Sequence, residues 1–156
     1  NFTYPMRLWA RMMRNVSSQT YLYWFNYYPP VLERKYKAFH GADLPYVFGQ
    51  LDMFGGKPLE TDFVDADMMM STWARFASNG DPNGRNIVGW EAFTPDNESY
   101  YILGLDNGPA NNLRVERMDL VEKAWAIRRV QGTPSLPAVM PTGLQDLMLK
   151  CNGVNL

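Results

Sequence analysis

The sequence predicts an α/β fold, because segments with helical and with strand character alternate along it. Residues 3–16 and 62–79 carry apolar side chains at helical spacing, whereas residues 20–28 form an aromatic run that is apolar on both alternating faces. A strand that is apolar on both faces belongs inside a sheet that is covered on both sides. Such a strand needs neighbours at both edges, and we expect this chain to supply too few of them.

The segment 3–16 is expected to form an amphipathic helix. Thr3 is a suitable N-cap and Pro5 fits the first turn. We interpret its basic face as solvated, although a binding patch is the alternative. The two faces are apolar Met6, Trp9, Met13 and Val16, and basic Arg7, Arg11 and Arg14.

A second helix is predicted over 62–79. Asp62 and Asp65 suit its positive end, and Asn79-Gly80 supplies a stop. The turn 81–84 follows, and we interpret its acid, Asp81, as structural. The apolar stripe of this helix is expected to consist of Ala66, Met69, Trp73 and Phe76.

The later part of the chain is expected to hold short strands and one more helix. Segments 90–93, 100–105 and 113–118 have strand character and are separated by proline, asparagine and glycine. Residues 120–129 are expected to form a helix, and 133–137 reads as an extended linker.

Composition excludes some classes of partner and favours others. The 15 basic and 16 acidic residues give a net charge of −1, so nucleic acid and anionic membranes are not indicated. We also expect no membrane span, since no apolar run approaches the roughly 20 residues that a bilayer requires. Cys151 is the single cysteine, which excludes an internal disulfide and a cysteine-based metal cluster. The 46% hydrophobic content favours a chain that packs against another polypeptide.

His40, the only histidine, lies in a tightly specified segment, 39–49 (Phe-His-Gly-Ala-Asp-Leu-Pro-Tyr-Val-Phe-Gly). Gly41 permits a backbone conformation that other residues avoid, and Asp43 is expected to cap a short helix with Pro45 in its first turn. A lone histidine is compatible with a structural role or with proton transfer.

Segment 39–49 resembles the histidine loop of the type-B carboxylesterases, the family of carboxylesterases, cholinesterases and related lipases. Two other stretches agree in the same order. Residues 20–30 resemble the strand upstream of that loop, and 73–77 (Trp-Ala-Arg-Phe-Ala) leading into 80–83 (Gly-Asp-Pro-Asn) resembles the tryptophan helix and turn.

The resemblance implies the C-terminal part of an α/β-hydrolase fold, with sheet strands and packing helices. It assigns residues 1–130 to the C-terminal part of the catalytic domain and leaves 131–156 as an extension. It also implies that an N-terminal segment or partner chain completes the fold.

By the same resemblance, His40 is the catalytic histidine of a serine–acid–histidine triad. The sequence holds no Gly-x-Ser-x-Gly elbow, so the serine and acid are assigned to the missing polypeptide. Glu33 lies on the same connection as His40 and is a poor substitute for an acid that the family takes from an earlier loop. Asp43 suits a helix cap or support of the histidine better than the triad role.

The implied function is hydrolysis of small-molecule carboxylic esters through an acyl-enzyme, with no metal or cofactor and no activity in this chain alone. A non-catalytic, cholinesterase-like adhesion protein is the alternative, and an independent domain with a structural histidine is a third reading. Three Asn-x-Ser/Thr triplets, beginning at Asn1, Asn15 and Asn97, suggest a secretory location.

Overall fold

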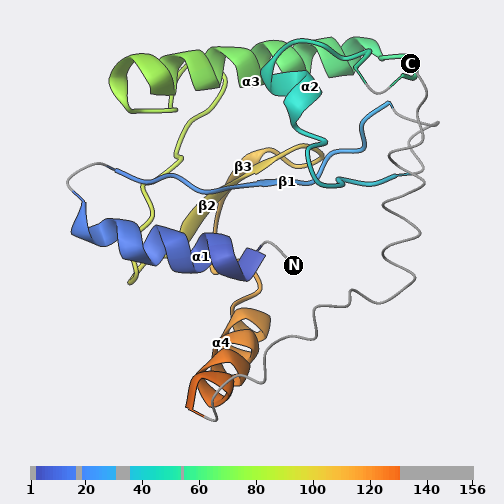
Figure 1. The fold of residues 1–156 in the computed structure, drawn as a ribbon. Helices are drawn as coiled ribbons and strands as arrows, with labels where there is room; N and C mark the ends of the chain where they lie inside the picture. Colours follow the sequence, from blue (N-terminus) through green and yellow to red (C-terminus); the bar gives the residue numbers. More distant parts are fainter. Residues whose placement is uncertain (1–2, 17–18, 31–35, 54, 131–156) are drawn as a thin grey trace. The chain divides into compact units, whose positions relative to one another are not determined.

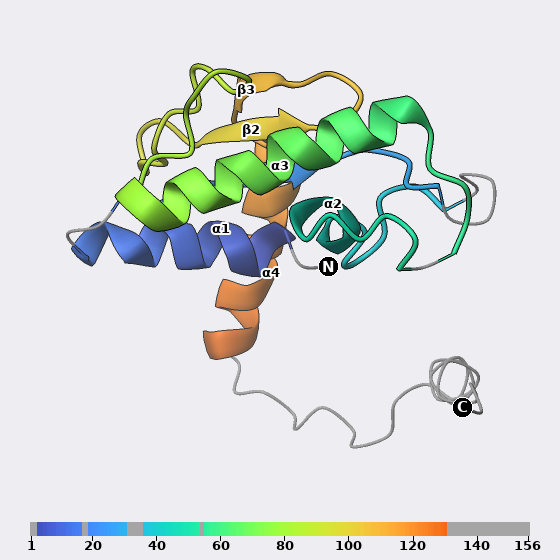
Figure 2. The same cartoon turned by 90° about the horizontal axis from the view of Figure 1, so that it is seen from above.

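The computed structural model describes residues 3–16, 19–30, 36–53 and 55–130. The described residues up to Val115 belong to one compact unit, and the remainder to a second. In the first unit a small sheet lies between helices. Helices α2 (Leu44–Val47) and α3 (Glu60–Asn79) cover one face, and α1 (Thr3–Met12) lies on the other (Figures 1 and 2). The expected α/β layering is therefore present.

The sheet of the described residues has the order β1-β2-β3. Strand β1 (Tyr23–Phe25) runs parallel to β2 (Ser99–Leu103), and β2 pairs with β3 (Gly108–Asn111) as an antiparallel hairpin. Within the described chain β1 is thus paired along one edge only. This agrees with the expectation that the chain supplies too few neighbours for its central aromatic strand.

Close approach between β1 and the end of β2 requires Gly104. A Cβ built there would lie 2.3 Å from Asn26 Oδ1 and 2.6 Å from the Tyr27 nitrogen, and the glycine has φ +143°. The Asn26 amide nitrogen of the main chain donates to the Leu103 oxygen at 2.9 Å, so the hydrogen bonding of the pair continues past β1.

Helix α3 confirms the prediction for 62–79 with a start two residues earlier. Gly80 has φ +79° and its N–H bonds the Phe76 carbonyl, a left-handed stop of the expected kind. Ala66 and Met69 are buried as expected, but Phe76 is 42% exposed. The core is completed by neighbours outside that stripe: Tyr46, Leu51, Met68, Ile87, Trp90, Tyr101 and Leu103.

The turn after α3 is structural, as expected. Two hydrogen bonds from Asn83 to the Asp81 carboxylate lower the pKa of Asp81. The bond from the main-chain N–H has the larger effect and the bond from the side-chain amide the smaller one. The side-chain amide of Asn83 also bonds the main chain of Trp90. The amide oxygen accepts from the Trp90 nitrogen and the amide nitrogen donates to the Trp90 oxygen, each at 2.8 Å.

Two of the three short strands predicted from the sequence, 90–93 and 113–118, are not strands in the structure. Residues 90–93 are irregular and contact residues 19–30, the stretch that contains β1 and is called the β1 segment below, through a bond from Phe93 N to Thr20 O at 2.7 Å. The segment 113–118 instead enters α4 (Val115–Val130), which also begins earlier than the predicted 120–129. β3 was missed because the sequence Gly-Pro-Ala-Asn has low strand propensity and pairs through its hairpin with β2.

The orientation of α1 reverses the prediction. Arg7 is 6% exposed, and its Nε donates to Glu98 Oε2 at 2.7 Å, whereas Met6 and Trp9 are 45% and 61% exposed. Arg11 binds the other oxygen of Glu98 through Nε, at 2.9 Å, and through a terminal guanidinium nitrogen. The basic face points inward because Arg7 and Arg11 bond the buried carboxylate of Glu98, which lies 91 residues from Arg7 in sequence. The short 3₁₀ turn η1 (Met13–Asn15) ends the helix.

In the second unit α4 is the described element, and Trp125 on it is 51% exposed. The extension 131–156, with Cys151 and the linker at 133–137, lies outside the described residues, as does Glu33. No helix within the described ranges is both long and apolar enough to cross a bilayer.

Replacing Glu98 with alanine is expected to lower the free energy of unfolding by about 3–5 kcal/mol, because Arg7 would keep its charge in a buried position without this carboxylate. Urea unfolding measures the loss. Glu91→Ala is the matched control, an exposed glutamate seven residues earlier that accepts a hydrogen bond from Asn97, and it should cost about 1 kcal/mol or less. Equal losses in the two variants would contradict the role of the buried pair.

Candidate catalytic histidine loop

His40 lies on a turn between the end of the β1 segment and α2, and it is exposed in the described structure. The turn is fixed by main-chain bonds from Ala42 N to Phe39 O at 3.0 Å and from Leu44 N to Gly41 O at 3.1 Å. Gly41 has φ +83°, which confirms the need for glycine, since other residues rarely adopt this conformation. The fully buried Ala42 anchors the turn, so the imidazole projects from a defined main-chain position.

Asp43 does not cap α2, contrary to the prediction. Its backbone is already helical, with φ −78° and ψ −24°, whereas a capping residue normally has an extended backbone that turns its side chain to the free N–H groups. The carboxylate instead accepts a hydrogen bond from the Tyr23 hydroxyl at 2.6 Å. Pro45 lies in the first turn of the helix, as predicted. The loop is therefore bonded directly to β1.

A second tyrosine–aspartate bond holds α2 against α3. Tyr46 is fully buried, and its hydroxyl donates to Asp62 Oδ1 at 2.7 Å. The other oxygen of Asp62 accepts from the main-chain nitrogen of Leu59 at 2.6 Å, which stabilises the start of α3 where the leucine side chain has no oxygen to act as a cap. The predicted stabilising position of Asp62 is right, and the structure adds the bond to Tyr46.

Tyr27 connects the end of the β1 segment to α3. Its hydroxyl lies 3.4 Å from Thr61 Oγ1 and also bonds Asp65. Burial raises the pKa of Asp65, the charge of Asp62 raises it further, and the bond from Tyr27 opposes both effects. The rings of Tyr27 and Tyr46 meet edge to face at 5.5 Å.

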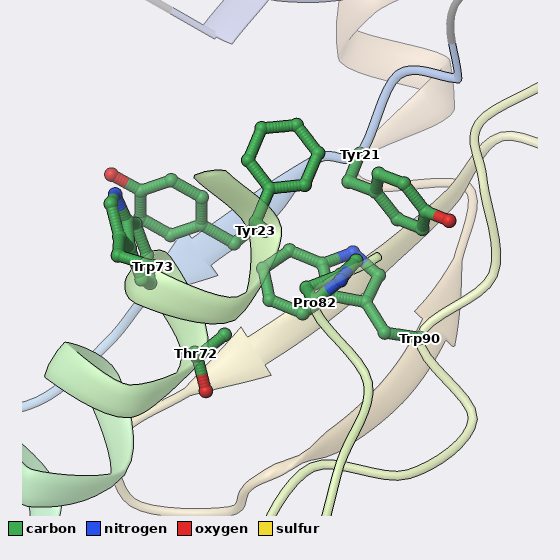
Figure 3. A pocket seen from close by; sticks show the side chains of 7 residues that line it. Tyr21, Tyr23, Thr72, Trp73, Pro82 and Trp90 are labelled. Atoms are coloured by element: carbon green, nitrogen blue, oxygen red, sulfur yellow. The ribbon is translucent and has the colours of Figure 1, made fainter. Parts of the chain in front are cut away.

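A cavity of about 140 Å³ lies between the β1 segment and α3 (Figure 3). Figure 3 shows the Tyr23 ring beside Trp73, with its hydroxyl directed away from Trp90. Trp90 is 4% exposed and its Nε1 has no hydrogen-bond partner among the described residues. The lining holds no carboxylate or imidazole, so it offers apolar contact and no acid–base group: Tyr21, Tyr23, Thr72, Trp73, Phe76, Pro82 and Trp90.

The described part of the chain contains no group of three or more histidine, cysteine, aspartate or glutamate side chains placed to hold a metal ion. Of the acids weighed as partners of His40, Glu33 lies outside the described residues, and the carboxylate of Asp43 is bonded to Tyr23.

The sequence profile described as the carboxylesterase family matches residues 1–121, which include the histidine loop and the whole sheet. The chain belongs to the carboxylesterase family. It spans about a quarter of the length of the curated relatives that it matches.

Among those family members, liver carboxylesterase 1F of Rattus norvegicus is 30% identical over 135 residues, which are 84% of this chain and 24% of the relative. Cocaine esterase of Homo sapiens is 33% identical over 111 residues, 67% of this chain and 19% of that protein.

Solved structures show the same fold. An esterase from Clostridium hathewayi, described as hydrolysing aliphatic aromatic polyesters, superposes with a TM-score of 0.66 at 23% identity, covering 77% of this chain and 24% of that one. A PNB esterase gives 0.56 at 26% identity, covering 65% and 21%. The layers described above are thus part of an α/β-hydrolase fold.

Sequence reasoning identified the loop of His40 but missed the two tyrosines that hold it. Tyr23 and Tyr46 lie 20 and 16 residues from their aspartates, and no spacing rule connects positions that far apart. The sequence does show the two acceptors, since it assigns Asp43 to a helix cap or to support of the histidine and Asp62 to the positive end of its helix, but it does not indicate their tyrosine partners.

Replacing Asp62 with alanine is expected to lower the free energy of unfolding by about 3 kcal/mol, because the Leu59 N–H and the buried Tyr46 hydroxyl both lose their acceptor. Tyr46→Phe should cost less, since Asp62 keeps its bond to Leu59. Asp67→Ala, an exposed change on the same helix, is the control and should stay within about 0.5 kcal/mol. Chemical denaturation tests the order, and a loss for Asp62→Ala no larger than the control's would refute it.

Tyr23 is expected to make the fold sensitive to alkali. Burial raises the pKa of its phenol above the ordinary 10.0, and the bond to Asp43 and the charge of that carboxylate raise it further. Above about pH 10 the unfolded chain releases this proton while the folded chain retains it, so stability falls as the pH rises. Tyr23→Phe should therefore lose less stability than the wild type between about pH 8 and about pH 11 in urea titrations. Equal alkaline losses would count against this assignment.

Proposed function

We propose that this chain supplies the catalytic histidine of a serine carboxylesterase, with His40 as the general acid and base. The observation that carries the proposal is the exposed His40 on a rigid turn beyond β1, within the part of the chain that matches the family. In open α/β sheets, functional groups gather on loops beyond the carboxyl ends of strands.

The serine nucleophile and the triad acid belong, in this proposal, to a polypeptide that completes the fold. The absence of a Gly-x-Ser-x-Gly elbow from the sequence supports this, as does the quarter of its relatives' length that the chain spans. The edge of β1 that no described strand pairs is a second support.

The exposed apolar face of α1 is a third support for a completing polypeptide. It forms one side of an open groove of about 370 Å³, and a surface of this kind is typical of an interface. Residues from α1, η1, the β1 segment and α3 line the groove: Met6, Trp9, Ala10, Met13, Gln19, Thr20, Tyr21, Leu22 and Phe76.

The reaction is hydrolysis of a small-molecule carboxylic ester in two steps. His40 accepts the proton of the serine hydroxyl as its oxygen attacks the ester carbonyl, then donates that proton to the departing alcohol. In the second step His40 accepts a proton from water as the water attacks the acyl-enzyme, and it returns the proton to serine as the acid product leaves. No metal or organic cofactor takes part, and this chain alone is inactive. The secretory location stays a prediction.

The decisive experiment labels the native particle that contains this chain with a serine-directed fluorophosphonate and determines intact masses. A companion polypeptide that carries the label supports the esterase. An unlabelled companion would favour the non-catalytic adhesion role. Ester hydrolysis by the purified 156-residue chain would refute the assignment of the serine to a partner.

Within the labelled particle, His40→Ala is expected to lower kcat for a p-nitrophenyl ester by at least about a thousandfold, because the serine loses its base. Gln50→Ala, an exposed change ten residues along the same segment, is the control and should leave kcat within about twofold of the wild type. If His40→Ala retains near-normal kcat, His40 is not the general base.

A further inference from the structure

The position of His40 depends on how its turn is attached to the rest of the fold. The internal bonds of the turn set its shape, but they do not fix it relative to the sheet that would present a substrate. After the turn, α2 is held to α3 through the buried Tyr46 and its bond to Asp62. Closer to the histidine, Ala42 is buried, and Asp43, three residues beyond His40, attaches the turn to β1 through its hydrogen bond with Tyr23.

The hydrogen bond between Tyr23 and Asp43 is short and lies at an exposed position. The oxygens are 2.6 Å apart, the short distance that a hydroxyl adopts with a charged carboxylate. The donor ring is itself held, since it meets Trp73 edge to face at 5.1 Å and Trp90 at 6.4 Å. A hydroxyl on a ring that packs against two tryptophans, at the first residue of β1, gives the carboxylate a defined partner.

The carboxylate of Asp43 is free for this purpose because it does not cap α2. Its main-chain oxygen accepts from Tyr46 and Val47 at 3.1 and 3.0 Å, so the residue is part of the helix while its side chain reaches the strand. Asp43 therefore joins three parts of the structure: the turn of His40, the first turn of α2, and β1.

We propose that Tyr23, the first residue of β1, is a positioning residue for His40 and acts through Asp43 to hold the histidine turn in place against β1. The inference rests on the proposed function and deepens it. Tyr23 touches neither substrate nor the reacting atoms in this scheme. Tyr23 affects the rate by setting the position of the imidazole. The rate of proton transfer depends strongly on that position, since a shift of about 1 Å can lower it about a hundredfold.

The experiment compares Tyr23→Phe with Tyr27→Phe in the particle that carries the serine. Tyr27 is the matched control: a tyrosine of the same segment whose hydroxyl lies 3.4 Å from Thr61 Oγ1 and bonds Asp65, both in α3. Active sites are counted by fluorophosphonate titration, so kcat is expressed per competent serine. Tyr23→Phe is expected to lower kcat about ten- to hundredfold with KM within about twofold, whereas Tyr27→Phe should leave both nearly unchanged.

Variants of the acceptor complete the test. Asp43→Ala should lower kcat as Tyr23→Phe does, and the double variant should be no slower than either single one, because the two residues act as one unit. Asp43→Asn keeps an oxygen that accepts from the hydroxyl and should recover most of the lost kcat.

Three outcomes would overturn the inference: a kcat for Tyr23→Phe equal to that of Tyr27→Phe, losses that add in the double variant, or an effect confined to the number of titratable sites. The last would mean that the bond only stabilises the fold. Failure of the proposed function is recognised separately, because the companion would then carry no fluorophosphonate label, or His40→Ala would keep the wild-type kcat.

Discussion

The buried ring of Tyr46 is the contact on which the histidine segment depends. It lies 5.5 Å from the rings of both Phe25 and Tyr27, and its hydroxyl bonds Asp62, so one side chain joins β1, α2 and α3. Helix α2 has four residues, too few to form a helix without tertiary contacts. The rigid turn that carries His40 therefore depends on Tyr46, six positions later. The Tyr46 ring packs against aromatic neighbours, and its hydroxyl bonds a buried carboxylate.

The second constraint is the carboxylate of Glu98, which decides which face of α1 points inward. Two arginines one turn apart on the helix approach the two oxygens of this side chain, and Arg7 and Glu98 are both largely excluded from solvent. Desolvation of charged groups is tolerated only where opposite charges and hydrogen bonds compensate it. The apolar face of α1 is consequently left exposed, in a family whose members are about four times longer than this chain.

Local signals predicted the parts of the fold that local chemistry determines. Gly80 as a stop, Gly41 with positive φ, Pro45 in a first turn and helix α3 all follow from a few adjacent residues. The failures involve partners distant in sequence. Nothing near Arg7 in the sequence indicates Glu98, nothing near Asp43 indicates Tyr23, and β3 forms because β2 is beside it. The candidate histidine was found through its motif, whereas its supports required coordinates.

The two kinds of contact also differ in the entropy needed to form them. Tyr46 and Asp62 are separated by 16 residues, but Arg7 and Glu98 are separated by 91. Closing the longer loop costs about 1.5 kcal/mol more in chain entropy, before any contact is formed. The contact that holds α2 to α3 therefore costs less chain entropy to form than the contact that holds α1 to Glu98.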